Sequence, residues 1–242
     1  AVVLGNPDYQ TESFTNRKTG ISINYNTDKF KALSSPKLLY LNENCEMVSP
    51  ADATRPMMSI RLNYKLNGEN IVFLNLHAPH TLDKNKRQFI NMRDNFESYI
   101  ELCIRGVYNS GDRIIIAGDF NEYYKKFRKD MINILGIKLY LKQKNPTCCG
   151  STGMKYPTLI YKPVNQVYDL LYDSEQFNGD VRVGSSKISD HHPIIGEFYK
   201  QPAAVALAAK PKVINVGYDF DGVLHRTMSN YERKRPGLYQ GH

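Results

Sequence analysis

The chain has 242 residues, of which 41% are hydrophobic and 23% are charged, a composition typical of one large globular domain. No apolar run approaches the length of a membrane span and no signal peptide is visible, so we expect no membrane partner. The formal net charge of +8 suits a polyanionic partner such as nucleic acid or a phosphorylated substrate, although a merely basic protein would carry the same charge.

The first predicted elements are strands. Residues 20–26 have the composition of a strand, and residues 56–66 alternate apolar and polar side chains, which predicts a strand with one buried face. Asn67 and Gly68 are a strong hairpin signal. The partner strand at 70–78 is so apolar that we expect it to be buried on both faces.

Helices and further strands follow. Apolar residues recur at spacings of three and four over 83–108, which predicts a helix. A buried strand is expected at 113–120 and a second helix at 124–137. Late strands are expected at 166–174 and 192–199. Strands that alternate with helices in this way indicate an α/β protein with a mixed sheet.

The composition changes near residue 201. Residues 201–212 are rich in Ala and Pro and are interpreted as a linker. An apolar strand that leads into two aspartates follows them. The expected organisation is a domain over residues 1–200, the linker, and a tail over residues 213–242.

Four cysteines stand at positions 45, 103, 148 and 149. They form no CxxC pair and no disulfide framework, which favours a reducing, intracellular compartment. The adjacent Cys148 and Cys149 are of a type that binds a soft metal, but no second Cys/His pair stands nearby at zinc spacing. Packing or coincidence is therefore the simpler account of this pair.

Polar residues stand where apolar strands end. His77 ends the strand at 70–78, and Asp119 and Asn121 follow the next apolar strand. In open α/β sheets, ligands bind beyond the carboxyl ends of strands. Each residue also has a bland explanation, namely a polar group at a sheet edge or an Asx turn.

Two further motifs contain acidic residues and histidine. Asp169 lies within an apolar strand, where a charge is costly unless it is paired, so it is a candidate partner for a histidine. Asp190 and His191 precede a late strand, and an Asp–His pair in such a place builds a base or a metal site. Alone, this second motif is an ordinary loop.

Five motifs occur in one order: "RPMMSIRL", "NLHAPH", "AGDFNE", "VYDLLYD" and "SDHHPI". With this set, residues 12–200 resemble the endonuclease/exonuclease/phosphatase family, which includes DNase I-like nucleases, abasic-site endonucleases, inositol-polyphosphate 5-phosphatases and sphingomyelinases. The resemblance implies the family's four-layer α/β sandwich, in which two packed mixed sheets carry helices on the outside.

The resemblance also implies a role for each matched residue. Asp119 would orient or deprotonate the attacking water, and Asn121 would position that water and contact the phosphate. His191, oriented by Asp169, would stabilise the charge that grows on the phosphate.

Further residues would complete the implied site. His77 would be a second imidazole on the phosphate, and Arg55 matches a phosphate-binding arginine of family nucleases. Asp190, with Asp119, would face a divalent metal, Mg²⁺ or Mn²⁺, because carboxylate oxygens suit a hard cation. Glu12 would be the carboxylate that pairs with His77.

The chain departs from the family pattern at its start. Family members open with a strand that carries an Asn and a second strand that ends in a metal-binding Glu. Little room exists for them before residue 20, and Asn6 and Glu12 are weak substitutes. Because the chain also starts at Ala1 rather than Met, we expect that it is a fragment or a processed product. The N-terminal strands were then removed or are supplied by another chain or segment, or the metal site is broken.

The tail carries a second resemblance. "VINVGYDFDGVLH" is similar to the first motif of haloacid-dehalogenase-like phosphatases, which implies Asp219 as nucleophile and Asp221 as acid/base. Too few residues follow Asp221 to build that fold, so an extended tail with an acidic turn describes this segment better. We expect the parent protein to continue into a phosphatase domain.

Basic segments flank the predicted site at 83–89 and 123–130, and Tyr123, Tyr124 and Phe127 are candidates for stacking on bases. This favours a Mg²⁺-dependent nuclease that acts on DNA or RNA. One alternative is a phosphatase for a phosphoinositide or a nucleotide. Another is an inactive structural or interaction module such as a virion component, since 17 Tyr and no Trp hint at the AT-rich genome of a large virus.

Overall fold

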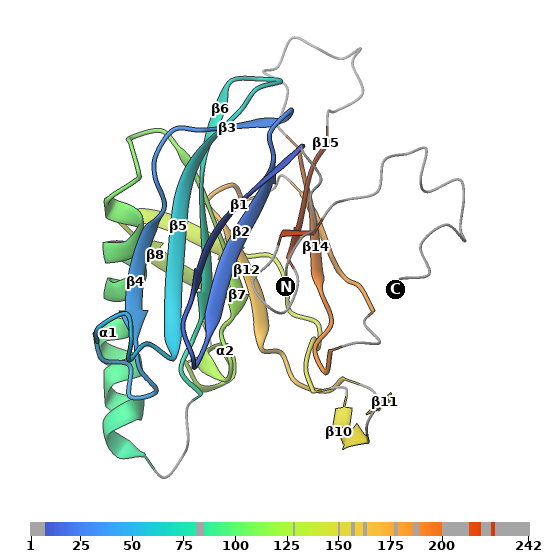
Figure 1. Cartoon of the computed structure of the whole chain (residues 1–242). Coiled ribbons are helices and arrows are strands. Elements are labelled where there is room, and N and C mark those ends of the chain that lie inside the picture. The colour runs from blue at the N-terminus through green and yellow to red at the C-terminus, as the bar shows by residue number, and fades with distance from the viewer. Residues whose placement is uncertain are drawn as a thin grey trace.

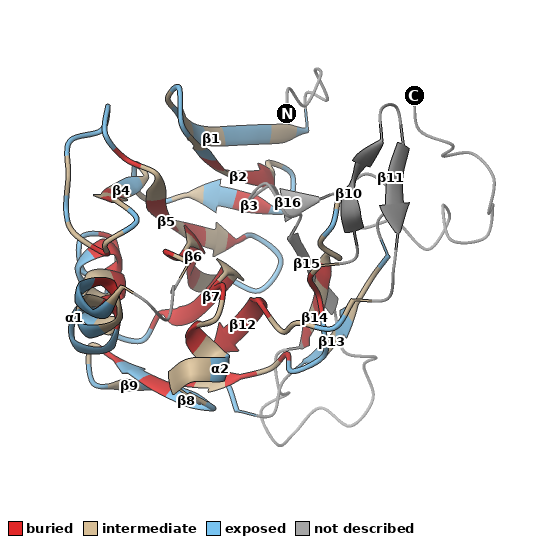
Figure 2. Ribbon diagram, turned by 90° about the horizontal axis from the view of Figure 1, so that it is seen from below, coloured by how far each residue is buried: buried red, intermediate tan, exposed pale blue. Residues whose placement is uncertain are grey.

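The computed structural model describes residues 8–80, 85–127, 129–149, 151–155, 158–161, 164–176, 179–185, 189–199, 213–218 and 224–225. They form an α/β sandwich in which a mixed main sheet lies between a helix and a second layer of strands (Figures 1 and 2). This confirms the predicted α/β sandwich, although among the described residues the second layer is antiparallel and the one long helix covers the main sheet from one side. Within the described residues, no helix is long and apolar enough to cross a membrane.

The main sheet has eight strands, and only its two central neighbours β6 and β7 run parallel among the described pairs. In sheet order the strands are β3 (Phe30–Ala32), β5 (Arg55–Tyr64), β6 (Glu69–His77), β7 (Arg113–Asp119), β12 (Asp169–Asp173), β9 (Ile137–Leu141) and β8 (Met131–Ile134), and β4 (Lys37–Leu41) also pairs with β5. Because β6 and β7 are parallel, both end at the same edge of the sheet.

The second layer consists of two separate sheets. One is the hairpin β1 (Tyr9–Thr15) and β2 (Gly20–Asn26). The other contains β13 (Asp180–Val183), β14 (Ile194–Tyr199), β15 (Val213–Tyr218) and β16 (Leu224–His225) in that order. A further hairpin is formed by β10 (Ser151–Lys155) and β11 (Thr158–Tyr161).

The main sheet is buried on both faces, and each face has its own apolar core. Along β6, Leu74 packs toward the helix while Phe73 packs toward the second layer, and Ile116 and Ile115 divide in the same way along β7. This confirms that strand 70–78 is buried on both sides. Strand β5 was expected to have one buried face, but residues from both of its faces are buried.

Helix α1 (Lys86–Arg105) confirms the predicted helix with slightly shorter bounds. The Asn85 side chain accepts a hydrogen bond from the Gln88 N–H and so caps the first turn. Met92, Phe96 and Ile100 lie on one face of the helix and are fully buried against the main sheet. The helix thereby connects the two parallel strands β6 and β7.

The helix predicted at 124–137 is wrong. It stops after the short α2 (Tyr123–Phe127), and residues 131–141 form the hairpin of β8 and β9 instead. Leu135 and Gly136 have positive φ angles of 55° and 78°, which makes a two-residue hairpin turn. The apolar residues of this segment also alternate with period two, and the sheet edge beside β12 selects that pattern.

The described residues of the tail, 213–218 and 224–225, are the strands β15 and β16 of one sheet. Strand β15 pairs with β14 over its whole length, so residues 213–218 lie in the same sheet as the preceding domain. The division into a domain, a linker and a separate tail stays a prediction. Asp219 and Asp221 lie outside the described residues.

Candidate active site

Three adjacent strands of the main sheet place His77, Asp119 and Asp169 in one row. In the strand register, Asp119 of β7 stands opposite His77 of β6 on one side and Asp169 of β12 on the other. Directly opposed residues point to the same face of a sheet, which here is the face toward the second layer. The row therefore brings one imidazole and two carboxyl groups together at the edge where β6 and β7 end.

Arg55 extends the row from the start of β5. Its Nη1 lies 3.1 Å from Nε2 of His77, and the same Nε2 lies 3.4 Å from Oδ2 of Asp119. Glu43 holds the guanidinium through two contacts, 2.8 Å from Oε1 to Nη2 and 3.1 Å from Oε2 to Nε. Arg55 is thus oriented from one side by a carboxylate and faces the row with the other.

The row alters the ionisation of its members. Burial, with the charges of Arg55 and His191, lowers the pKa of His77 to about 3, so its ring is neutral near pH 7. Burial and the neighbouring Asp169 raise the pKa of Asp119 to about 7. The pKa of Asp169 is also raised well above its ordinary value because the group is buried.

The turn after β7 is shaped by Asn121. Its φ of 51° is in the left-handed region, which Asn tolerates, and its N–H donates to Oδ1 of Asp119 at 2.7 Å. Its side-chain amide donates to the Ala78 carbonyl at 2.6 Å, and the Ala78 N–H donates to the Asp119 carbonyl at 2.7 Å. These bonds join the loops that follow β6 and β7 and fix the Asp119 carboxyl group.

His191 reaches the row from the loop before β14. Its Nδ1 lies 3.0 Å from Oδ2 of Asp169, and both side chains are largely buried. The Thr147 hydroxyl accepts from the Asp169 N–H at 3.0 Å, and the Thr147 carbonyl accepts from the His192 N–H at 2.7 Å. Because Asp169 engages Nδ1, the other ring nitrogen, Nε2, faces away from the pair, and the Cys148 sulfur lies 3.0 Å from it.

Most of the predicted site residues are brought together. Arg55, His77, Asp119, Asn121, Asp169 and His191 converge at this edge, and Asp190 lies beside His191.

Glu12, by contrast, does not contact His77 among the described residues. It lies on β1, where its carboxylate accepts from Gln10. The hairpin turn at Asn16 is the part that contacts the loop before β5, and Glu12 is four residues further along the strand.

The predicted stacking residue Tyr123 is also placed differently. It is buried in the core between α1 and the main sheet, and its hydroxyl donates to Glu97 at 2.6 Å. Tyr124 and Phe127 pack against the same core. Since stacking on a base needs an accessible ring, Tyr123 is excluded from that role in this structure.

Two neighbours of the site escaped the sequence analysis. Glu43 lies in a loop with no periodic signal, and only its ion pair with Arg55 reveals it. Cys148 was attributed to packing or coincidence, but its sulfur lies 3.0 Å from Nε2 of His191 and is joined to Cys149 in a disulfide. Adjacent cysteines gave a signal for chemistry, but nothing in the sequence located them beside His191.

No protein-family model matches the chain. An uncharacterised protein of Acanthamoeba polyphaga mimivirus, L684, is 32% identical over 179 residues, which cover 69% of this chain. Those residues are 31% of the mimivirus protein, so the chain spans about a third of the length of this relative.

Solved structures resemble the fold at low sequence identity. A mannosyl-6-phosphatase of Bacteroides thetaiotaomicron has a TM-score of 0.50 at 18% identity, and the match covers 78% of this chain and 76% of that one. An endonuclease/exonuclease/phosphatase protein of Bacteroides vulgatus has a TM-score of 0.51 at 14% identity with the same coverage. The chain therefore has the α/β sandwich fold of the endonuclease/exonuclease/phosphatase proteins.

Proposed function

We propose that this chain hydrolyses phosphate esters with the help of a divalent cation and that its substrate is a nucleic acid. The observation that carries the proposal is the row of His77, Asp119 and Asp169, which His191 and Arg55 join at the end of β6 and β7. Ester hydrolysis needs a base for water and positive or hydrogen-bonding groups for the phosphate oxygens. These residue types meet both needs within one sheet edge.

Asp119 is the proposed general base. In the metal-free chain burial raises the pKa of this carboxyl group to about 7, so it gains and loses a proton near neutral pH. With a cation bound, Asp119 would orient the attacking water. The Asn121 N–H holds one carboxylate oxygen in place. The other oxygen, Oδ2, lies 3.4 Å from Nε2 of His77.

The phosphate would be held by the basic side of the row. Arg55 would supply a permanent positive charge. His77 would supply a hydrogen bond without a charge, because the lowered pKa of His77 keeps its ring neutral. Asp169 fixes the tautomer of His191 and would stabilise the imidazolium that gives Nε2 a proton to donate. His191 then neutralises charge on the phosphate oxygens.

The donor set fits a divalent cation. Ligand atoms of Asp119, Asp169 and His191 all lie within 4.8 Å of one another. Besides burial, Asp169 raises the pKa of Asp119 and Asp190 raises the pKa of Asp169, so these carboxyl groups concentrate negative charge that a cation would relieve. We propose that Asp119 and Asp190, whose carboxylates each lie within 4.8 Å of a ring nitrogen of His191, hold Mg²⁺ or Mn²⁺, since such ions prefer carboxylate oxygens. When bound, the ion supplies positive charge for the substrate phosphate.

Charge supports a nucleic-acid substrate. The chain has a net charge of +8, and α2, which begins two residues after Asn121, carries Lys125 and Lys126. Lys125 is exposed. Basic residues directly beyond the proposed base suit a substrate with phosphates on both sides of the cleaved bond.

The experiment is a hydrolysis assay of this chain on labelled single- and double-stranded DNA and RNA with Mg²⁺ or Mn²⁺. Asp119→Asn and His191→Ala should each lower kcat/KM by at least about 10²-fold, the scale of a lost acid–base group. Glu12→Gln is the matched control and should keep the full rate, because Glu12 lies on β1, where its carboxylate accepts from Gln10. Near-normal rates in both site variants would contradict the proposal, and a folded chain with no hydrolysis would favour an interaction module.

A further inference from the structure

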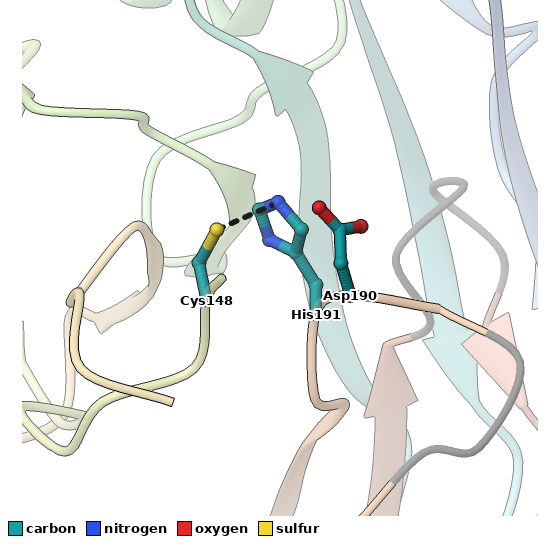
Figure 3. A group of neighbouring side chains, drawn as sticks. All are labelled: Cys148, Asp190 and His191. Carbon is teal, nitrogen blue, oxygen red and sulfur yellow. Dashed lines mark hydrogen bonds between the residues drawn. The ribbon is translucent and has the colours of Figure 1, made fainter. Parts of the chain in front are cut away.

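A second cluster of ligands shares His191 with the row. The sulfur of Cys148, the carboxylate of Asp190 and a ring nitrogen of His191 lie within 4.8 Å of one another (Figure 3). The sulfur is 3.0 Å from Nε2 of His191. Two ligands of a tetrahedral Zn²⁺ stand roughly 3.5 Å apart, as follows from bonds of about 2.0–2.3 Å, so little movement would admit the ion.

We propose that Cys148, Asp190 and His191 form a binding site for a soft divalent cation such as Zn²⁺. Thiolate and imidazole are ligands that favour Zn²⁺ over Mg²⁺, and three protein ligands leave the fourth position for water. Asp190 is exposed, so the ion has a path from solvent.

The surroundings of His191 support this site independently. Zinc-bound histidines usually donate their other ring N–H to a carboxylate, which fixes the tautomer and the ring. Asp169 is that carboxylate for His191, because its Oδ2 lies 3.0 Å from Nδ1. The nitrogen left for the metal is therefore the one that faces Cys148.

Backbone pairing holds the sulfur in position. Cys148 is buried, and it exchanges N–H and carbonyl hydrogen bonds with Gln166 at 2.9 Å each. An antiparallel bridge joins it to His191 as well. Both ligands thus sit on backbone that is fixed before any metal arrives, which lowers the entropy lost on binding.

The site depends on the redox state of Cys148. In the structure this sulfur is bonded to Cys149, and a disulfide sulfur is not a thiolate ligand. A dithiol or phosphine reductant supplies two electrons, two protons enter from water or the dithiol, and the S–S bond becomes two thiols. Zn²⁺ then replaces the Cys148 proton, which passes to the buffer. Metal binding is thereby restricted to the reduced chain.

Occupancy would block hydrolysis, a consequence that rests on the proposed function. The ion would take Nε2 of His191 and the Asp190 carboxylate, which are the groups assigned there to the phosphate and to Mg²⁺. Zn²⁺ would therefore inhibit rather than activate.

The test compares two serine variants that differ by one position. Zn²⁺ affinity is measured by competition with a chromophoric chelator, with and without a phosphine reductant. The reduced chain and Cys149→Ser should bind one ion equally, and Cys149→Ser should do so without reductant because it has no disulfide. Cys148→Ser and the oxidised chain should each bind Zn²⁺ at least tenfold more weakly than the reduced chain does. Equal affinity of the two variants, or no binding by either, would overturn the site.

Two further measurements separate this site from the proposed function. Co²⁺ in place of Zn²⁺ should give a thiolate charge-transfer absorption in Cys149→Ser that is missing in Cys148→Ser, which identifies the ligand without any substrate. In the hydrolysis assay, Zn²⁺ should inhibit Cys149→Ser at lower concentration than Cys148→Ser. Zn²⁺ binding and Co²⁺ absorption without any hydrolysis would support the metal site and contradict the proposed function. Normal hydrolysis without the Co²⁺ absorption would support the proposed function and contradict the metal site.

Discussion

Asp119 is placed under opposite demands by the chemistry proposed for it and by the stability of the fold. As a base it must lose its proton, but burial beside Asp169 favours the protonated form and raises its pKa to about 7. The folded chain then binds more protons than the unfolded chain between the ordinary carboxyl pKa of about 4 and pH 7. The contribution of this group to stability is therefore lost as the pH rises through that window.

We expect Asp119→Asn to stabilise the fold while it removes activity. The amide has no charge to bury, so at pH 8 and without divalent cations the melting temperature should rise by about 2–8 °C, the shift that 1–2 kcal/mol produces in a chain of this size. Thermal melts followed by circular dichroism from pH 4 to pH 8 measure the effect. Asp190→Asn is the control, because Asp190 is exposed and should change the melting temperature little. A lower melting temperature of Asp119→Asn at pH 8 would contradict the burial argument.

At the scale of elements, the row depends on how closely β6 and β7 approach. Gly118 stands directly before Asp119 with a φ of 147°, and a Cβ built there would lie 2.0 Å from the Leu76 carbonyl oxygen. The clash is with backbone, so no side chain could move to relieve it. Glycine is thus required for the register that sets His77 beside Asp119.

Gly118→Ala should therefore separate the two strands at the site. We expect a loss of at least about 2 kcal/mol in the free energy of unfolding and a loss of hydrolysis, since strain of this kind costs more than an ordinary substitution. Urea unfolding and the hydrolysis assay measure the two effects. Gly68→Ala is the comparison, because Gly68 also has a positive φ but its Cβ would meet nothing within 4 Å. Equal stability of the two variants would show that the approach of β6 and β7 is not limiting.

Elements with a clear burial pattern, on one face or on both, could be predicted from the sequence. The strands at 70–78 and 113–120 are mostly apolar because both of their faces pack, and α1 was predictable from its single apolar face. The helix predicted at 124–137 is wrong because the isoleucines at 132, 134 and 137 satisfy a helical and a strand period alike. Only the turn at Gly136 and the free edge beside β12 decide between them.

The site was predictable where its residues end or interrupt such strands. His77, Asp119 and Asp169 stand out because a polar group in an apolar strand has to be explained. Glu43 and Cys148 lie in loops, where composition is not constrained by burial, and their contacts arise from pairings more than ten residues away in sequence. Such contacts leave no local pattern to detect.

At the scale of the whole molecule, the net charge of +8 gives the proposed nucleic-acid substrate a measurable signature. Each contacted phosphate of a single strand releases counterions, so log(kcat/KM) below saturation should fall with log[salt] by about 0.7 per contact. For four contacts, the rate on single-stranded DNA should fall by about 50-fold between 50 and 200 mM salt. A small phosphate monoester should respond far less.

The matched variant for this prediction is Lys125→Ala. Lys125 is an exposed residue of α2. Its replacement should reduce the slope of log(kcat/KM) against log[salt] by about 0.7, the contribution of one phosphate contact. Steady-state assays over a salt series give both slopes. A weak salt response on DNA that equals that on the monoester would favour a phosphatase for a small substrate.

The assembly of the row also determines when it exists during folding. Its three members stand 42 and 50 residues apart in the chain, and α1 lies between the two strands of the first pair. Pairings of such long range close large loops and accumulate late on a folding pathway. Partly folded chains, with local hairpins such as β8–β9 already formed, would therefore lack the buried pair of Asp119 and Asp169. They would also lack the contact between Asp169 and His191. The site would appear at the final step, so its chemistry would report complete folding.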